Sequence, residues 1–311
     1  MNSVGIIARK EFQSAFRNRL FITIAVLFLA LSILSVYIGS ATKRAELRVY
    51  NETVATLTAQ GVTALPLLPE IHTLTILANL TEYVSIVGAI LAVMLGYNAI
   101  IQEKESGSLK LILSRPVYRD RLLTGKLLGN ATVIAALLGL VFVFNLALLL
   151  LVGGITPTGG EVLRLFSFVG MAFFYMLIFL TLAMLLGIRM TNSATVFLVS
   201  LVVWMLLSFV LPQMAEALMA NSTVINSISG TANQIPQDTA ASQAINFLSP
   251  TWHLRHIGAQ LLEVAPGSLT VNAATLISNW LTTLLVLLAP SIAFMAAGYA
   301  LFLRDETLVL E

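Results

Sequence analysis

The chain has 311 residues and a formal net charge of +2; 58% of its residues are hydrophobic and only 10% are charged. A mean hydropathy of +0.92 and repeated apolar runs exclude an ordinary soluble domain, which carries about 25% charged residues. Cysteine is absent, which excludes disulfides, iron–sulfur ligation and thiol catalysis. We therefore expect a single all-α, polytopic membrane domain over residues 1–311, without a nucleic-acid partner.

An amphipathic helix is expected over residues 3–19. Its apolar side holds Val4, Ile7, Ala8, Phe12, Ala15 and Phe16, and its polar side holds Arg9, Lys10, Gln13 and Arg17. Glu11 is the exception, because it falls on the apolar side. A basic amphipathic helix beside a span usually lies in the membrane interface, although a simple positive flank would show the same pattern. No small-residue cleavage site follows, so the first span is expected to stay in place.

Six hydrophobic stretches are long enough to cross a bilayer, which takes about 20 residues. They cover residues 20–39, 76–101, 129–152, 165–188, 194–211 and 273–303. Pro212 is expected to end the fifth stretch and Pro290 to kink the sixth. Two larger loops cover 40–75, with some helix near Ala45–Gln60, and 213–272.

Lysine and arginine set the expected orientation. With the N-terminus inside, twelve of these residues lie on the inner face and five on the outer face. The outer five are Lys43, Arg44, Arg48, Arg164 and Arg255. Both termini are therefore expected in the cytoplasm, together with the loop 102–128, and the two larger loops are expected outside.

The loop 102–128 carries six Lys/Arg residues and a short helical pattern. Gly107 and Ser108 allow a turn and a helix start, and Pro116 ends the helix. Leu109, Ile112 and Leu113 fall on one face between them. A short helix with an apolar face in a basic loop cannot bury that face alone, so it predicts a cytoplasmic partner. The preference for basic residues in cytoplasmic loops explains Lys110 and Lys126 about as well as contact with a partner does.

The string EKESGSLKLILSRPVYR, at Glu103–Arg119, resembles the cytoplasmic signature of the ABC-2-type transporter permease family. That signature runs as Glu, then Gly-Ser/Thr-Leu, then Leu-Leu-Ser-x-Pro and a basic residue. The strings ARKEF at Ala8–Phe12 and FLSP at Phe247–Pro250 are also similar to that family. Within it, the pattern is most similar to the permeases of nitrous oxide reductase and multi-copper-enzyme maturation.

The resemblance implies a permease half with the type V ABC exporter fold in a prokaryotic cytoplasmic (inner) membrane. Two copies, with a homodimer favoured, would pair with two ATP-binding cassette subunits that hold ATP and Mg. The chain has no G-x-x-x-x-G-K-[ST] loop, so no cofactor is expected on it. The implied coupling helix is Gly107–Ser114. Residues implied at the ATPase contact are Glu103, Glu105, Gly107, Ser108, Leu109, Ile112, Leu113, Ser114, Pro116 and Arg119, with Arg9, Lys10, Glu11 and Arg17 on the interfacial helix.

Four polar residues in or near the spans could line a substrate path: Glu82, Asn98, Asn145 and Tyr175. Such residues more often hydrogen-bond neighbouring helices. His253 and His256 have no third ligand, so no metal site is expected, and a surface or interfacial helix explains them better.

Several functions remain open beside a permease that exports a substrate. An intramembrane enzyme needs polar groups that converge at one depth, and no span carries such a pair. A proton- or ion-coupled secondary transporter usually has buried carboxylates, and only Glu82 qualifies. A third interpretation is a force transmitter that drives an accessory protein outside the membrane, which the external loops are large enough to bind. A non-catalytic role is therefore expected, with copper-enzyme maturation implied by the resemblance and the substrate undetermined.

Overall fold

The computed structural model describes residues 3–61, 73–107, 118–151, 156–225, 232–264 and 273–304, without the side chains of 221–225, 232–235 and 273–277. Six helical stretches in this part of the chain are long and apolar enough to cross a membrane, which confirms the expected all-α polytopic class. They are Arg19–Ala59, Thr73–Glu105, Arg119–Leu151, Gly159–Arg189, Ser193–Ala217 and Ser278–Arg304.

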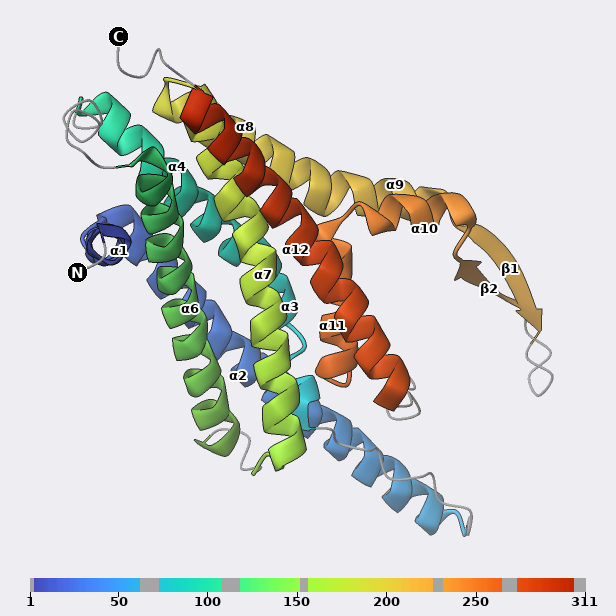
Figure 1. The fold of residues 1–311 in the computed structure, drawn as a ribbon. Helices are drawn as coiled ribbons and strands as arrows, with labels where there is room; N and C mark the ends of the chain where they lie inside the picture. The colour runs from blue at the N-terminus through green and yellow to red at the C-terminus, as the bar shows by residue number, and fades with distance from the viewer. Residues whose placement is uncertain are drawn as a thin grey trace.

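Two helices form the N-terminal part. α1 (Ser3–Ala15) ends four residues short of the expected boundary. α2 (Arg19–Ala59) then begins at Asn18, whose side chain accepts a hydrogen bond from the backbone N–H of Leu20 at 3.0 Å. With 41 residues, α2 is about 60 Å long at 1.5 Å per residue, so much of the segment expected as an external loop continues the first helix. Its distal half extends beyond the other helices (Figure 1).

The second span is assembled from four short elements. They are the 3-10 turn η1 (Thr73–Leu77), α3 (Leu80–Tyr83), the π-helical turn η2 (Val84–Gly88) and α4 (Ala89–Glu105). α6 (Arg119–Leu151) and α7 (Gly159–Arg189) follow as unbroken helices. Thr158 and Glu161 form a capping box at the start of α7.

The fifth span is α8 (Ser193–Met205), the π-helical turn η3 (Leu206–Val210) and α9 (Leu211–Ala217). It continues past Pro212, where the sequence predicted its end. Proline has no N–H for the carbonyl four residues back and its ring presses on that carbonyl. The wider π turn directly before Pro212 relieves this conflict, and the proline sits at the start of α9, where an N–H is not needed.

The expected loop 213–272 contains regular structure. β1 (Ala220–Ile225) and β2 (Ala232–Gln237) form an antiparallel hairpin in which Ala220 lies opposite Gln237. α10 (Ala240–Phe247) and α11 (Pro250–Leu261) lead to α12 (Ala273–Arg304), which contains Pro290. The sequence predicted a surface or interfacial helix here, and α11 is not a free surface helix, because it packs against α7, α12 and α3 (Figure 1).

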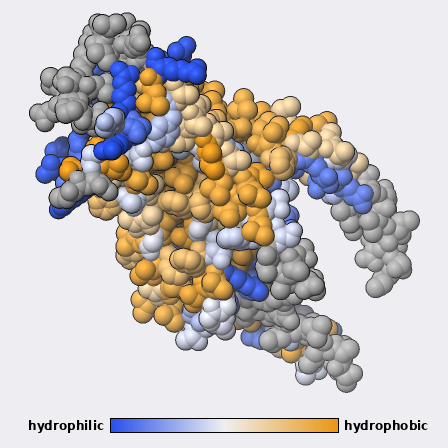
Figure 2. Space-filling model, in the orientation of Figure 1, coloured by the Kyte–Doolittle hydropathy of each residue, from blue (hydrophilic) through white to orange (hydrophobic). Residues whose placement is uncertain are grey.

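α4 and α7 form the centre of the bundle. Their most apolar stretches are 78% and 72% buried, against 17–39% for the other four spans. A Cβ at Gly96 of α4 would lie 2.4 Å from the carbonyl oxygen of Leu180 in α7, so only glycine permits this approach. The surrounding helices present large apolar side chains outward, among them Val143, Leu198, Val202 and Leu285. Figure 2 shows this continuous apolar surface, which suits contact with lipid.

Candidate functional site

Lys126 is the most unusual charged residue in the described part of the chain, because only 1% of its side chain is exposed. It lies in the first turns of α6, and its Nζ is 2.9 Å from Glu11 Oε1 and 2.8 Å from Glu103 Oε2. Lys10 Nζ approaches Glu103 Oε1 at 2.5 Å. We call Lys10, Glu11, Glu103 and Lys126 the Lys126 cluster. Two ammonium and two carboxylate groups balance formally, which is what burial of charge requires.

The Lys126 cluster joins three elements that are far apart in the sequence. α1 supplies Lys10 and Glu11, α4 supplies Glu103 and α6 supplies Lys126. Burial opposes the positive charge of Lys10, but the hydrogen bond and the charge of Glu103 outweigh it and the pKa of Lys10 is raised. The cluster therefore remains charged at neutral pH on its Lys10 side, and it ties α1 to both spans.

Two glycines bring α1 close enough for these contacts. A Cβ at Gly125 would lie 2.7 Å from Ile7 Cβ, and a Cβ at Gly129 would lie 2.6 Å from Glu11 Cβ. The spacing is the G-x-x-x-G pattern that lets two helix backbones meet inside a membrane. α1 thus packs on the first turns of α6. Its location in the membrane interface stays a prediction. Arg9 of α1 and Arg17 in the turn after it remain exposed.

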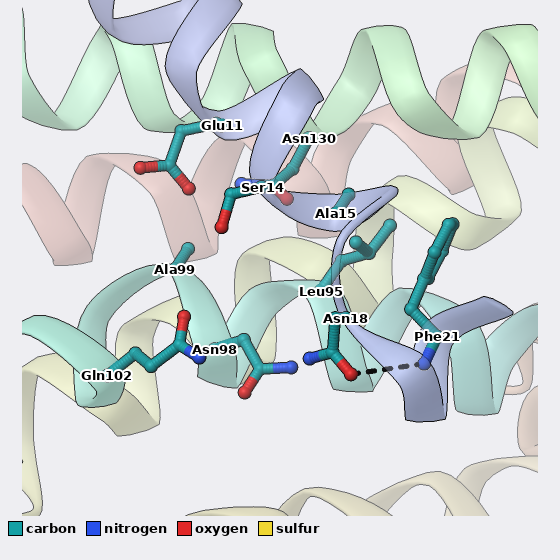
Figure 3. A pocket seen from close by; sticks show the side chains of 10 residues that line it. All are labelled: Glu11, Ser14, Ala15, Asn18, Phe21, Leu95, Asn98, Ala99, Gln102 and Asn130. Carbon is teal, nitrogen blue, oxygen red and sulfur yellow. Dashed lines mark hydrogen bonds between the residues drawn. The ribbon is translucent and has the colours of Figure 1, made fainter.

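A narrow polar crevice lies between α1 and α4 beside the cluster (Figure 3). Glu11 and Ser14 point into it from α1 and face Asn98 and Gln102 of α4 (Figure 3). Asn98, one of the four expected path residues, therefore lies at this end of the bundle and beside α1.

Both ends of the loop expected to dock an ATPase are fixed to the bundle. Lys104 donates hydrogen bonds to the carbonyl oxygens of Ile188 at 2.6 Å and Met190 at 3.2 Å, at the turn between α7 and α8. At the other end, Arg119 donates to the carbonyl oxygen of Phe302 in α12 at 3.3 Å.

Two more of the expected coupling residues lie at the end of α4. Glu105 accepts a hydrogen bond from the backbone N–H of Ser193, at 3.3 Å and at the start of α8. Gly107 has φ +67°, a backbone conformation that favours glycine, and it turns the chain away from α4. Ser108, Leu109, Ile112, Leu113, Ser114 and Pro116 lie outside the described residues.

The other expected path residues lie apart from the Lys126 cluster. Asn145 of α6 is fully buried and donates to Ser32 Oγ of α2 at 2.8 Å. Glu82 accepts from Arg255 Nη2 of α11 at 2.7 Å. Tyr175 of α7 is fully buried and donates to the carbonyl oxygen of Ser85 at 2.7 Å. Each of these residues joins two helices, the alternative role that the sequence left open.

The two histidines of α11 have different neighbours. His253 is buried, and its Nε2 lies 3.1 Å from the carbonyl oxygen of Phe247. His256 is exposed and stacks on Trp252 with ring centroids 4.9 Å apart. Within the part of the chain that the structure describes, no three His, Asp or Glu residues lie close enough to hold a metal ion.

Sequence reasoning missed the role of Lys126 and of α11. The apolar-face position of Glu11 was the available signal, because a carboxylate on a buried helix face needs a cation. Its partner Lys126 lies 115 residues further along the chain, so the sequence did not identify which cation that is. Arg255, Ser208 and Thr251 gave no comparable signal, since their partners lie 43–173 residues away.

Six apolar helical spans, four of them around the buried pair α4 and α7, with ion pairs near the helix ends, define a multi-pass membrane protein of the kind found in the bacterial cytoplasmic membrane. Residues 6–307 match the family described as ABC-2 family transporter protein, so the chain belongs to that family.

Two relatives are similar to part of the chain. Both are described as probable ABC transporter permease protein NosY: that of Stutzerimonas stutzeri is 31% identical and that of Pseudomonas aeruginosa is 32% identical, each over 135 residues. The matched segment covers 43% of this chain and 41% of each relative.

Proposed function

We propose that this chain is the membrane subunit of an ABC transporter and that a separate ATP-binding subunit drives it. Family membership supports a permease without its own catalytic site. ATP and Mg would be bound by the partner, because the sequence carries no phosphate-binding loop of the G-x-x-x-x-G-K-[ST] type. The transporter would export a substrate, or it would transmit force to a protein on the outer side.

The Lys126 cluster is the observation that carries this proposal. It lies where α1, the end of α4 and the start of α6 meet, and the loop implied as the coupling helix connects those same two spans. A displacement of that loop or of α1 would move α4 and α6 together. Buried ion pairs and close glycine contacts resist movement of the three helices relative to one another.

We infer the orientation from the charge distribution. Placing both termini in the cytoplasm puts twelve of seventeen basic residues on the inner side, together with the Lys126 cluster and the loop 102–128. α11 and the β1–β2 hairpin then lie toward the outer side, where an accessory protein would bind.

The assembly we favour holds two copies of this chain and two ATP-binding subunits. Among the described helices, α2, α6, α8 and α12 expose large apolar side chains, so each copy has room for a partner within the membrane. The loop motif at Glu103–Arg119 is similar to permeases of copper-enzyme maturation, and maturation of a metalloenzyme is the process we propose for the complex.

The test is the replacement of the apolar loop face by charge. Ile112→Asp with Leu113→Asp should leave the permease inserted but abolish its stimulation of the ATP-binding subunit's hydrolysis, measured in proteoliposomes. Leu111→Asp is the matched control, because it introduces the same side chain on the opposite face of the expected helix and should retain stimulation. If the double variant is expressed normally and stimulates ATP hydrolysis as strongly as the wild-type chain, this loop is not the coupling element. In that case ion- or proton-coupled transport without an ATPase becomes the leading function.

A further inference from the structure

A polar cavity of about 300 Å³ lies beside the Lys126 cluster, between α1 and α4. All four residues of the cluster line it, and the uncharged lining is Ser14, Asn98, Ala99, Gln102 and Ser106. The cavity shares Ser14, Asn98 and Gln102 with the crevice of Figure 3, so the two adjoin. The crevice adds the apolar side chains of Ala15, Phe21 and Leu95. The space between α1 and α4 thus has a charged end and a partly apolar end.

Charges of both signs are available to a ligand in this cavity. The Lys10 side chain is 58% exposed and its Nζ donates to Glu103, which leaves two of its three N–H donors for a ligand or water. Glu11 accepts from Lys126 through Oε1, and no second hydrogen bond to this carboxylate is formed within the described residues. Figure 3 shows the Glu11 carboxylate directed into the crevice. A ligand can therefore meet an ammonium donor and a carboxylate acceptor in one place.

Two uncharged side chains add hydrogen-bonding capacity to the cavity. Ser14 and Gln102 both line it, and neither forms a side-chain hydrogen bond in the part of the chain that the structure describes. A polar side chain in such a place is normally satisfied by water or by a ligand. Because Ser14 lies on α1 and Gln102 on α4, a ligand bound to both holds the two helices together.

The charge balance favours a ligand that carries one positive and one negative group. The ammonium and carboxylate groups of the Lys126 cluster already sum to zero, so a ligand with a net charge would leave that charge unbalanced. A phosphate accepts hydrogen bonds from Lys10 and Gln102, and a primary ammonium donates to Glu11. A quaternary ammonium has no N–H and is held by aromatic rings instead. The described lining of the cavity contains no aromatic ring, which favours the primary ammonium.

The apolar end connects the cavity to the outer surface of the bundle. Phe21 lines the crevice and packs edge to face on Phe16, with ring centroids 5.9 Å apart. Phe16 is 49% exposed, and Leu20 in the first turn of α2 is 58% exposed. An acyl chain can follow these side chains from the crevice to the surface that suits contact with lipid. A soluble zwitterion would leave this apolar end unused.

We propose that the cavity is a lipid site that binds the headgroup of phosphatidylethanolamine. Its phosphate accepts from Lys10 and Gln102, its ammonium donates to Glu11, and its acyl chains leave past Phe21 and Phe16. The bound lipid fills the space between α1 and α4 and joins the two helices. The site rests on the contacts of this chain alone and needs no ATP-binding subunit, so it stands or falls separately from the proposed function.

The first test offers the purified permease three lipids in equal amounts in detergent: phosphatidylethanolamine, phosphatidylcholine and phosphatidylglycerol. Native mass spectrometry should show phosphatidylethanolamine retained about tenfold more than either competitor, since neither has an ammonium N–H to donate to Glu11. Equal retention of the three lipids would overturn the site. A preference for phosphatidylglycerol would also overturn it, because the exposed basic residues of the chain alone would give that result.

Soluble phosphoethanolamine separates a lipid from a free headgroup. Phosphatidylethanolamine should raise the unfolding temperature of the permease, because it binds the folded state, and soluble phosphoethanolamine at the same concentration should leave it unchanged. Equal stabilisation by the two compounds would contradict a lipid site.

Two substitutions test the polar lining. Gln102→Leu with Ser14→Leu changes exposed positions and should lower retention of phosphatidylethanolamine about tenfold, the effect expected for losing hydrogen bonds to a charged group. Gln13→Leu is the matched control, because it makes the same replacement at an exposed position of α1 outside the cavity lining. Equal retention by the double variant and the control would show that the lipid binds elsewhere.

A cysteine at the cavity tests the location directly, since the chain has no cysteine of its own. Ser106→Cys, in the lining, should react with a water-soluble maleimide about tenfold more slowly in vesicles of equal parts phosphatidylethanolamine and phosphatidylcholine than in phosphatidylcholine alone. The reason is that only the unoccupied fraction reacts. Gln13→Cys should react at the same rate in both. A Ser106→Cys variant that reacts equally fast in both vesicles would refute the site.

Discussion

At the residue scale, Lys126 shows how context decides the role of a charge. A lysine at the start of a span usually sets the orientation of the chain in the membrane, and in that role its side chain is exposed to water. Lys126 is instead enclosed between Glu11 and Glu103, so its removal would leave a buried carboxylate without its cation. Removing one partner of a buried ion pair costs far more than the pair itself contributes.

We predict that Lys126→Met lowers the stability of the permease by about 3–5 kcal/mol, the usual cost of breaking a buried pair. Thermal unfolding in detergent measures the effect. Adding Glu11→Gln should recover part of the loss, because Lys126 is its described ion-pair partner.

Lys43→Ala is the control for this prediction. It removes a lysine whose pair with Glu46 is exposed, and such pairs contribute about 0–1 kcal/mol. Equal effects of the two lysine variants would contradict the structural role of the cluster.

His253 gives the permease a dependence on pH. Burial lowers the pKa of His253 and the nearby His256 lowers it further, while the hydrogen bond to Phe247 raises it too little to reverse this. Above about pH 6.5, both the folded and the unfolded state hold a neutral imidazole, so His253 adds no pH dependence. Below that pH the unfolded state binds the proton first, and stability falls as pH falls.

We therefore predict that the unfolding temperature of the wild-type chain drops between pH 6.5 and pH 5, and that His253→Gln makes the drop shallower. Melting curves of both proteins across this range measure the difference. Parallel curves would show that His253 does not titrate differently in the folded state.

At the element scale, the contact between α1 and α6 depends on two missing Cβ atoms. Gly129→Ala would place a methyl group 2.7 Å from the carbonyl oxygen of Ala8, so α1 has to move. We expect a loss of about 1–3 kcal/mol, typical of overpacking, and weaker stimulation of the ATP-binding subunit.

Gly139→Ala is the matched control, because it lies in the same helix with nothing within 4 Å of the added methyl group. It should be neutral or stabilise the helix by up to about 1 kcal/mol. A Gly129→Ala variant that behaves like Gly139→Ala would contradict tight docking of α1.

The sequence predicted some elements better than others, for physical reasons. Hydrophobic runs predicted all six spans, since a bilayer demands length and apolarity whatever the neighbours are. The predicted end of the fifth span at Pro212 was wrong. A proline ends a helix only where the turn before it cannot widen, and here the turn before it is the wider π turn η3. α11 carries two histidines and an arginine, and its burial depends on partners such as Glu82 that only the fold brings near.

At the scale of the whole molecule, α4 and α7 connect the two ends of the bundle. The Lys126 cluster joins α4 to α1 and α6 at one end, and Tyr175 of α7 joins the turn before α4 to α11 further along. The sequence predicted several members of both groups, including Glu11, Glu103 and Tyr175. It could not group them, because pairs separated by 90 or more residues follow no helical period.

This layout makes one claim central: motion enters at the end that holds α1 and the loop 102–128. On the proposed function, the ATP-binding partner would bind at that end.

Affinity purification of the tagged permease in mild detergent, with mass spectrometry of what accompanies it, tests this claim most directly. We predict an ATP-binding subunit in equal number, which is lost when the segment Gly107–Ser114 is altered and retained in Gly139→Ala. A permease that purifies without any nucleotide-binding partner would contradict it.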